Sequence, residues 1–181
     1  MSVYTTVAPD QLALWLAPLG VGAPGTLTGI AAGMQNSNYF VTAGGRPWVL
    51  TLFEHLAPRD LDFYLAFQDH LAVRAIPCPR PLATADGRFW RPLAGKPAAL
   101  FNCLPGECIE APTAAHCRTL GAMLARLHLA GADFPSPLPN PCGHDWRERT
   151  GRRLAPALPA DERGRLRAEL DFQAAQDYSE L

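Results

Sequence analysis

Apolar residues recur at helical spacing near the start of the chain. The positions that carry the repeat i, i+3, i+4, i+7 are Leu12, Trp15, Leu16 and Leu19. This repeat predicts an amphipathic helix over residues 9–19, with Pro9 at its first position and Gly20 directly after its end.

The next pattern is typical of strands. Aromatic and β-branched runs at residues 39–41 and 48–50 flank two glycines at 44–45. Two adjacent glycines favour a hairpin because tight turns between strands need positive φ. Another strand is predicted around residues 26–30, so three strands in sequence indicate an antiparallel meander. A small, polar loop over residues 29–38 leads into the hairpin.

One helix is predicted before the remaining strands. Its apolar spacing covers residues 58–74 and ends before a proline-rich segment, residues 76–81, which must be extended. A second hairpin is expected over residues 81–92, around an Asp-Gly turn. The short apolar run at residues 97–102 predicts a strand in the interior of the sheet.

The pattern changes after the last predicted strand. Residues 104–107 contain proline and glycine and mark a boundary, beyond which the apolar spacing is helical. A helix is predicted over residues 113–130, capped by the threonine at its start. A proline-rich loop at residues 135–141 separates it from two arginine-rich helices, at residues 145–154 and 161–175.

The predicted order is strands with one inserted helix, then a hinge, and then helices only. This α+β order resembles the protein-kinase-like fold. In that architecture an antiparallel β-sheet forms the N-terminal lobe, and nucleotide binds in the cleft between the lobes. We therefore expect a β-rich nucleotide-binding lobe over residues 1–103. Residues 104–181 are expected to form the hinge and the beginning of a helical C-terminal lobe, which this chain leaves truncated.

Composition narrows the class of protein. Hydrophobic residues make up 48% of the 181 residues and charged ones 18%, which is typical of a globular domain. A net charge of −1 gives no basic field for nucleic acid. The five cysteines show no metal-ligand spacing, so no metal site is predicted from them. With no signal-peptide pattern and no apolar run of about 18 residues, we expect a soluble, cytoplasmic protein without a membrane partner.

Three stretches carry a specific resemblance. They are GMQNSNYFVTAGGRPWVLTLFE (33–54), HLAVRAIPCPRPLATADGR (70–88) and PTAAHCRTLGAMLARLHLAGADF (112–134). Together they resemble the homoserine kinases of the aminoglycoside/choline phosphotransferase-like group. The LARLH run alone fits any phosphotransferase of this group, whereas NSNYFV and LTLFE narrow the resemblance towards homoserine kinase.

The resemblance implies a function for the full-length family member. It transfers the γ-phosphate of ATP to the hydroxyl of L-homoserine in threonine biosynthesis, with Mg²⁺ as the accompanying ion. Two alternatives stay open: another small-molecule phosphotransferase, acting on an amino alcohol, choline or an aminoglycoside, or a non-catalytic nucleotide-binding module. The oligomeric state is not predicted.

The resemblance also implies residues that this chain lacks. Kinases of the group carry an H-x-D-x-x-x-x-N catalytic loop and a later metal-binding aspartate. Neither His144-Asp145 nor Asp133-Phe134 fits that spacing and order. The catalytic loop and the metal ligands are therefore expected beyond Leu181, and no catalytic residue is assigned in this chain. We expect the chain to be an N-terminal fragment that is inactive alone.

The phosphate-binding residues are predicted from the glycine-containing loop. Its candidates are Gly33, Asn36, Ser37 and Asn38. Their backbone amides and short side chains suit phosphate, although an ordinary hairpin loop has the same composition. Thr51 completes the set by resemblance, at a position where related enzymes commonly have a lysine or arginine. Glu54 either faces the same cleft or is a solvated carboxylate at the end of its strand.

The adenine pocket is predicted from the strands and the hinge. Val49 and Ile30 are expected to pack on the adenine face, with plain core packing as the alternative. Phe101 is expected at the back of the pocket. The Asn102 carbonyl and the Leu104 N–H are expected to pair with the adenine edge, with a featureless linker as the alternative.

Overall fold

The structure is a computed structural model that describes residues 3–136, 138, 140 and 142–176. It forms two compact units, Met1–Ser136 and Pro137–Leu181. The predicted lobe boundary at residue 103 lies within the first unit. Part of the predicted proline-rich loop, at residues 137, 139 and 141, lies outside the described residues.

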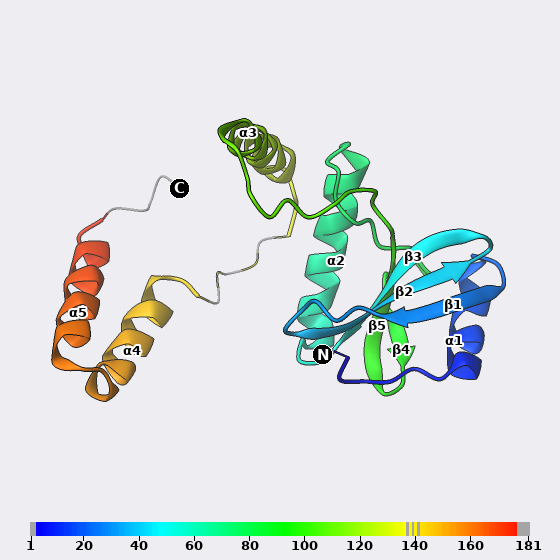
Figure 1. Cartoon of the computed structure of the whole chain (residues 1–181), viewed down its shortest axis with the longest axis horizontal. Helices are drawn as coiled ribbons and strands as arrows, with labels where there is room; N and C mark the ends of the chain where they lie inside the picture. The colour runs from blue at the N-terminus through cyan, green and yellow to red at the C-terminus, as the bar shows by residue number, and fades with distance from the viewer. Residues whose placement is uncertain (1–2, 137, 139, 141, 177–181) are drawn as a thin grey trace. The chain divides into compact units, whose positions relative to one another are not determined.

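A five-stranded antiparallel sheet forms the centre of the first unit (Figure 1). The strands are β1 (Pro24–Gly29), β2 (Asn36–Ala43), β3 (Arg46–Phe53), β4 (Arg91–Leu93) and β5 (Lys96–Asn102). Their order is β1-β2-β3-β5-β4, so the predicted meander is confirmed and the 97–102 run lies in the interior of the sheet. Gly44 and Gly45 form the β2–β3 turn at φ values of 56° and 72°, a region that side chains disfavour.

The predicted hairpin over residues 81–92 forms only at its turn, where Thr84 N donates to Arg88 O at 2.7 Å, and the two strands predicted to flank the turn do not pair with each other. Leu82 N donates to Leu100 O, so this segment pairs with β5, and Pro81 contributes a single isolated bridge to Phe101. Proline has no N–H with which to extend a ladder. The hairpin that does form joins β4 to β5 through Ala94 and Gly95, which have φ values of 50° and 77°.

The helices match the apolar repeats of the sequence. In the first unit they are α1 (Pro9–Leu16), continued by the short η1 (Ala17–Leu19), α2 (Pro58–Val73) and α3 (Ala114–Gly131). The Thr113 hydroxyl accepts a hydrogen bond from His116 N and caps α3, as predicted. The second unit contains α4 (His144–Leu154), η2 (Ala155–Ala157) and α5 (Ala160–Ala174). None of the helices in the described ranges is long and apolar enough to cross a membrane.

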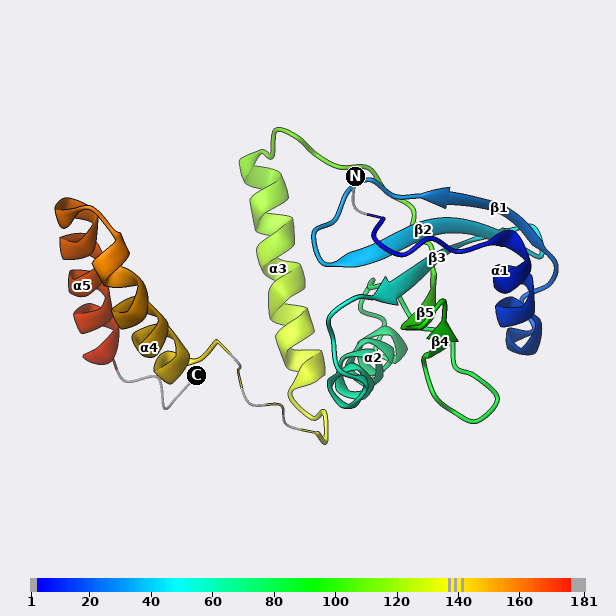
Figure 2. The same ribbon diagram turned by 90° about the horizontal axis from the view of Figure 1, so that it is seen from below.

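The sheet has two faces, because side chains alternate along each strand. One face, called here the α1 face, packs against α1 in a large apolar cluster. The cluster includes Leu12, Trp15, Leu16, Val41, Leu50, Leu52 and Leu100. The other face, called here the α2 face, packs against Leu61 and Leu65 of α2 through Ala99 and Phe101. Figures 1 and 2 show α2 beside β5 in both views.

Helix α3 lies along α2 and packs loosely. No residue of α3 is buried, and Leu120 and Leu124 are 61% and 45% exposed. Just after α3, the ring of Phe134 packs edge-to-face against the ring of Phe67 of α2, with ring centroids 5.1 Å apart. Arg74 Nη2 lies 2.7 Å from Asp133 Oδ2, so aromatic and charged contacts join the two helices at this end.

Candidate functional site

The strand register places most of the predicted nucleotide residues on one face of the sheet. Asn38 pairs with Thr51 across β2 and β3, and Val49 pairs with Phe101 across β3 and β5. Ile30 N donates to Asn38 O at 2.8 Å, so Ile30 lies opposite Asn38. Alternate residues of a strand point to the same side of the sheet. The other four residues therefore lie on the same face as Phe101, which is the α2 face.

This face is only partly covered. Phe101 is 6% exposed and packs on the apolar cluster of α2, whereas Val49 and Ile30 are half-buried. Phe40, which pairs with Val49, is 49% exposed on the same face. Sequence reasoning used Phe40 only as a strand-forming residue. Phe40 comes two residues after Asn38 in the same strand, so both side chains lie on one face. This spacing is the sequence signal that places Phe40 beside the candidate site.

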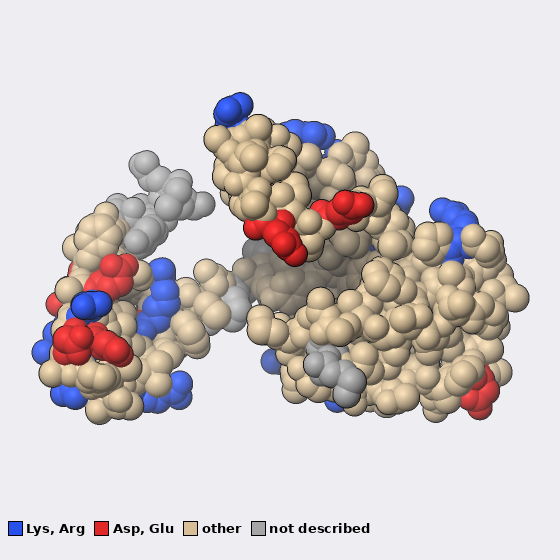
Figure 3. Space-filling model, in the orientation of Figure 1, with Lys and Arg blue, Asp and Glu red and all other residues tan. Residues whose placement is uncertain are grey.

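A cavity of about 560 Å³ lies where the glycine-containing loop enters β2, and Asn36 is the predicted nucleotide residue among those that line it. It is lined by Gln35, Asn36, Phe53, His55, Leu56, Tyr64, Leu65, Phe67 and Gln68. Asn36 and Phe53 are a cross-strand pair with the alternation of Asn38 and Thr51, so the cavity lies on the α2 face. The space-filling view shows the molecule hollowed between the sheet and the helices of the first unit (Figure 3).

The loop itself, residues 30–35, joins β1 to β2. Gly33 is exposed and has φ of 134°, a conformation that favours glycine. Met34 beside it is 89% exposed. A small residue at position 33 keeps the neighbouring backbone accessible, as a loop that wraps phosphate through its N–H groups requires.

Thr51 and Asn38 bind each other. Thr51 Oγ1 donates to Asn38 Oδ1 at 2.8 Å, and Asn38 Nδ2 donates to Asn36 O at 3.4 Å. The Thr51 proton is therefore already committed to the amide. Thr51 orients Asn38, and the second N–H of the Asn38 amide is the polar group of this pair that remains to reach a ligand.

Ser37 lies elsewhere than predicted. It is fully buried on the α1 face, because it alternates with Asn36 and Asn38. Its hydroxyl accepts from the backbone N–H of Tyr4 and Thr5, at 2.8 and 2.9 Å, and donates to Glu54 at 2.6 Å. The side chain of Ser37 is thus used within the fold, so the prediction is corrected for its hydroxyl, whereas phosphate contact through its backbone amide stays a prediction.

Glu54 is neither solvated nor on the α2 face. Its side chain is 4% exposed, and it accepts from Ser37, from Thr5 at 3.0 Å and from Lys96 at 3.1 Å. Burial alone would raise the pKa of Glu54, but these hydrogen bonds and the Lys96 charge hold the pKa below its usual value. Lys96 is the only lysine of the sequence. Because its ammonium group binds Glu54, it does not supply the charge that Thr51 lacks.

The side chain of Asn102 orders the hinge. Asn102 Oδ1 accepts from Arg80 N at 2.5 Å, and Asn102 N donates to Arg80 O at 3.2 Å. Leu104 is 40% exposed. Within the described ranges no hydrogen bond uses the Leu104 N–H, so this donor is available at the position predicted for the adenine edge.

The part of the chain that the structure describes has no cluster of side chains that would hold a metal ion by itself. No three His, Cys, Asp or Glu side chains of that part of the chain come together in a way that would hold a metal ion. These residues alone give Mg²⁺ no complete ligand set, and no step through a metal ion is derived from them.

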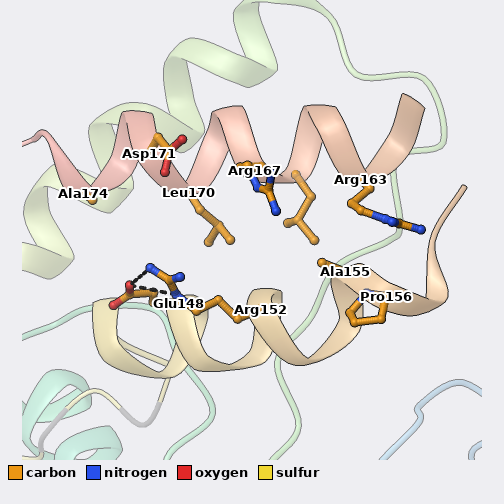
Figure 4. A pocket seen from close by; sticks show the side chains of 10 residues that line it. Glu148, Arg152, Ala155, Pro156, Arg163, Arg167, Leu170, Asp171 and Ala174 are labelled. Carbon is orange, nitrogen blue, oxygen red and sulfur yellow. Dashed lines mark hydrogen bonds and ion pairs between the residues drawn. The ribbon is translucent and has the colours of Figure 1, made fainter. Parts of the chain in front are cut away.

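A separate groove of about 450 Å³ lies within the second unit, between α4 and α5 (Figure 4). Three arginines line it, Arg152, Arg163 and Arg167, and the Arg152 guanidinium binds Glu148 at 2.6 Å. Arg152 itself is exposed. Leu170 of α5 packs over Gly151 of α4, where a methyl group would come within 2.7 Å of it.

Comparison with known proteins identifies relatives over nearly the whole chain. Residues 26–180 match the model of the phosphotransferase enzyme family. The chain is 45% identical to a homoserine kinase of Cupriavidus taiwanensis over 179 residues, which are 97% of this chain and 54% of that protein. It is 42% identical to a homoserine kinase of Methylobacillus flagellatus over 181 residues, which are 100% of this chain and 57% of that protein. The chain therefore spans about half the length of the curated relatives it matches.

Among solved structures, the chain resembles a spectinomycin phosphotransferase crystallised with ADP and spectinomycin. The TM-score is 0.56 at 16% identity, over 82% of this chain and 46% of that protein. This similarity concerns the fold, and it confirms the predicted α+β architecture of an antiparallel sheet with an inserted helix.

Proposed function

The chain belongs to the phosphotransferase enzyme family, and we propose that it is the nucleotide-binding part of a homoserine kinase. The complete reaction moves the γ-phosphate of ATP to the hydroxyl of L-homoserine and leaves O-phospho-L-homoserine and ADP. The homoserine assignment rests on relatives that carry this name and are similar along the whole chain.

One structural observation carries the nucleotide part of the proposal. Residues chosen from sequence for separate reasons meet on the α2 face, beside a cavity that reaches the glycine-containing loop. The α1 face of the same strands is filled by apolar packing. The sheet therefore offers a nucleotide one face only.

The apolar residues of the α2 face would bind the adenine ring. Val49, Ile30 and Phe40 supply half-buried or exposed apolar surface, and Phe101 closes the back against α2. Burial of such surface by the ring stabilises binding by about 25 cal/mol per Å². The hinge backbone, through the Asn102 carbonyl and the Leu104 N–H, would pair with the polar edge of the ring.

The polar end of the face would bind the phosphates. The backbone N–H groups of residues 32–35 and the Asn38 amide supply neutral donors, with Thr51 fixing the amide. Thr51 adds no charge, and Lys96 is bound to Glu54. Charge neutralisation of the triphosphate is therefore assigned to Mg²⁺, which the family's chemistry uses. Its ligands are expected in the part of the relatives' length that this chain does not span.

The proposal predicts binding without turnover for the 181-residue chain. The sequence has no H-x-D-x-x-x-x-N loop to align the homoserine hydroxyl for in-line attack. The test is a coupled ADP-release assay with ATP, Mg²⁺ and homoserine, run beside a nucleotide titration. Saturable ATP binding with no ADP release supports the proposal, and phosphorylation of homoserine by this chain contradicts it.

Two other functions are the alternatives to this proposal. The shared fold with spectinomycin phosphotransferase favours another small-molecule acceptor. The second alternative is a non-catalytic nucleotide-binding module. An extended protein of the relatives' length, assayed with homoserine, choline and an aminoglycoside, separates these. Homoserine as the preferred acceptor supports the proposal, another acceptor supports the first alternative, and no turnover supports the second.

A cytoplasmic location is part of the same proposal. The five cysteines, all of them in the described part of the chain, are Cys78, Cys103, Cys108, Cys117 and Cys142, and each is a free thiol. Free thiols are usual in a reducing compartment, where amino-acid biosynthesis would take place.

A further inference from the structure

The first described residues of the chain lie on the α1 face of the sheet, at the edge of the candidate site. Residues 3–7, called here the N-terminal strap, run beside the start of β2 and the ends of β1 and β3. Val3 packs on Gly29 so closely that a Cβ there would lie 2.9 Å from the Val3 methyl. Val7 is 4% exposed within the core of the α1 face. Both ends of the strap are thus fixed by packing.

The middle of the strap is fixed by hydrogen bonds to buried polar groups. Tyr4 N and Thr5 N both donate to Ser37 Oγ, and Tyr39 Oη donates to Thr5 O at 2.7 Å. Ser37 Oγ in turn donates to the Glu54 carboxylate at 2.6 Å. A hydrogen bond to a charged acceptor, such as the one from Ser37 to Glu54, is about twice as strong as a neutral one.

The strap also contacts the loop directly. Tyr4 Oη donates to Met34 O at 3.1 Å, across 30 positions of sequence. Met34 lies next to Gly33, the most permissive position of the loop. A loop that contains glycine loses much conformational freedom when it is ordered, and order that exists before binding reduces that cost.

We propose that the N-terminal strap is a positioning element for the phosphate loop. Anchored on Ser37 and Glu54 at the α1 face, it holds residues 30–35 through the Tyr4–Met34 hydrogen bond in the conformation that receives phosphate on the α2 face. The inference rests on the proposed function, because it assigns the phosphates of the nucleotide to this loop. It makes Tyr4, Ser37 and Glu54 positioning residues that do not touch the ligand.

Tyr4→Phe tests the link between strap and loop. It removes one hydroxyl from a side chain that is 59% exposed, so the fold is retained. The affinity for ATP with Mg²⁺ is expected to fall roughly two- to tenfold, the usual effect of losing one hydrogen bond, while the affinity for adenosine stays constant. The matched control is Thr84→Val, which deletes a hydrogen-bonded hydroxyl from a loop outside the site and is expected to leave both affinities unchanged.

Amide hydrogen exchange in the nucleotide-free protein tests the same link independently of binding. Tyr4→Phe is expected to speed exchange in residues 31–35, with no change in β3 or in the Thr84→Val control. Equal loop exchange in wild type and Tyr4→Phe overturns the inference, as does an unchanged ratio of ATP to adenosine affinity. If wild-type protein binds no ATP, the proposed function is wrong, and the exchange comparison still decides whether the strap orders the loop.

Discussion

The two faces of the sheet come from the same strands and differ in what covers them. On the α1 face Leu50 and Leu52 are 0% exposed beneath α1, and the strap closes the edge near Ser37. On the α2 face Phe40 is 49% exposed between residues that are half-buried. One face is therefore filled by the apolar core, whereas the other leaves apolar surface and polar groups accessible, and the proposed nucleotide site lies there.

The largest effect is expected on the α1 face. Leu50→Ala removes a fully buried side chain, and such substitutions lower the free energy of unfolding by about 2–5 kcal/mol. Urea unfolding followed by circular dichroism measures it. The control is Leu14→Ala, since Leu14 is 77% exposed on α1, and a change within about 0.5 kcal/mol is expected there. Equal losses in the two variants would mean that this face is not the core.

The next effect is expected at the buried carboxylate. Glu54→Gln leaves Lys96 without its ionic partner and weakens the bonds from Ser37 and Thr5, at a cost of about 1–3 kcal/mol at neutral pH. The control is Glu162→Gln, an exposed residue of α5. If both variants unfold at the same urea concentration as wild type, the hydrogen bonds and the ion pair of Glu54 do not stabilise the fold.

The same carboxylate predicts a pH dependence. The pKa of Glu54 is lower in the folded protein than its ordinary value of 4.5. Its contribution to stability is therefore fully present above that ordinary value and is lost as the pH falls through the lower folded pKa. Urea midpoints measured from pH 7 downwards are expected to fall less steeply for Glu54→Gln than for wild type. Parallel curves would show that another group controls acid unfolding.

The smallest effect on stability, but a selective effect on binding, is expected on the α2 face. Val49→Ala removes two methyl groups from half-buried surface that would contact adenine, so affinity for ATP and adenosine should fall together, by up to about tenfold. Val73→Ala is the control, since Val73 is 60% exposed at the end of α2. Unchanged affinities in the Val49 variant would remove the adenine ring from this face.

Much of the fold follows from local patterns in the sequence. The i, i+3, i+4 spacing of α1 and α2, the Gly44-Gly45 turn and the Thr113 cap each act within a few residues, so they are visible without the structure. The hairpin at residues 81–92 was mispredicted because its turn signal is local, whereas its pairing with the edge of β5 is not.

The candidate site follows from the sequence only in part. Strand alternation separates Asn36 and Asn38 from Ser37, and it would have placed Ser37 with the buried residues Tyr39 and Val41. The partners of Ser37 lie far along the chain, at positions 4, 5 and 54, so no spacing rule reveals the network. The family resemblance implies that the ligand is a nucleotide, and the strand register shows that most of the candidate residues share the α2 face.

The central claim is that nucleotide binds the α2 face and not the α1 face. Methyl NMR spectra of the 181-residue chain, titrated with ATP and Mg²⁺, test it most directly, because both faces carry methyl groups. The account predicts saturable shifts at Ile30 and Val49, with Val41 and Leu52 on the α1 face unmoved. No saturable shift, or larger shifts at Val41 and Leu52, would contradict it.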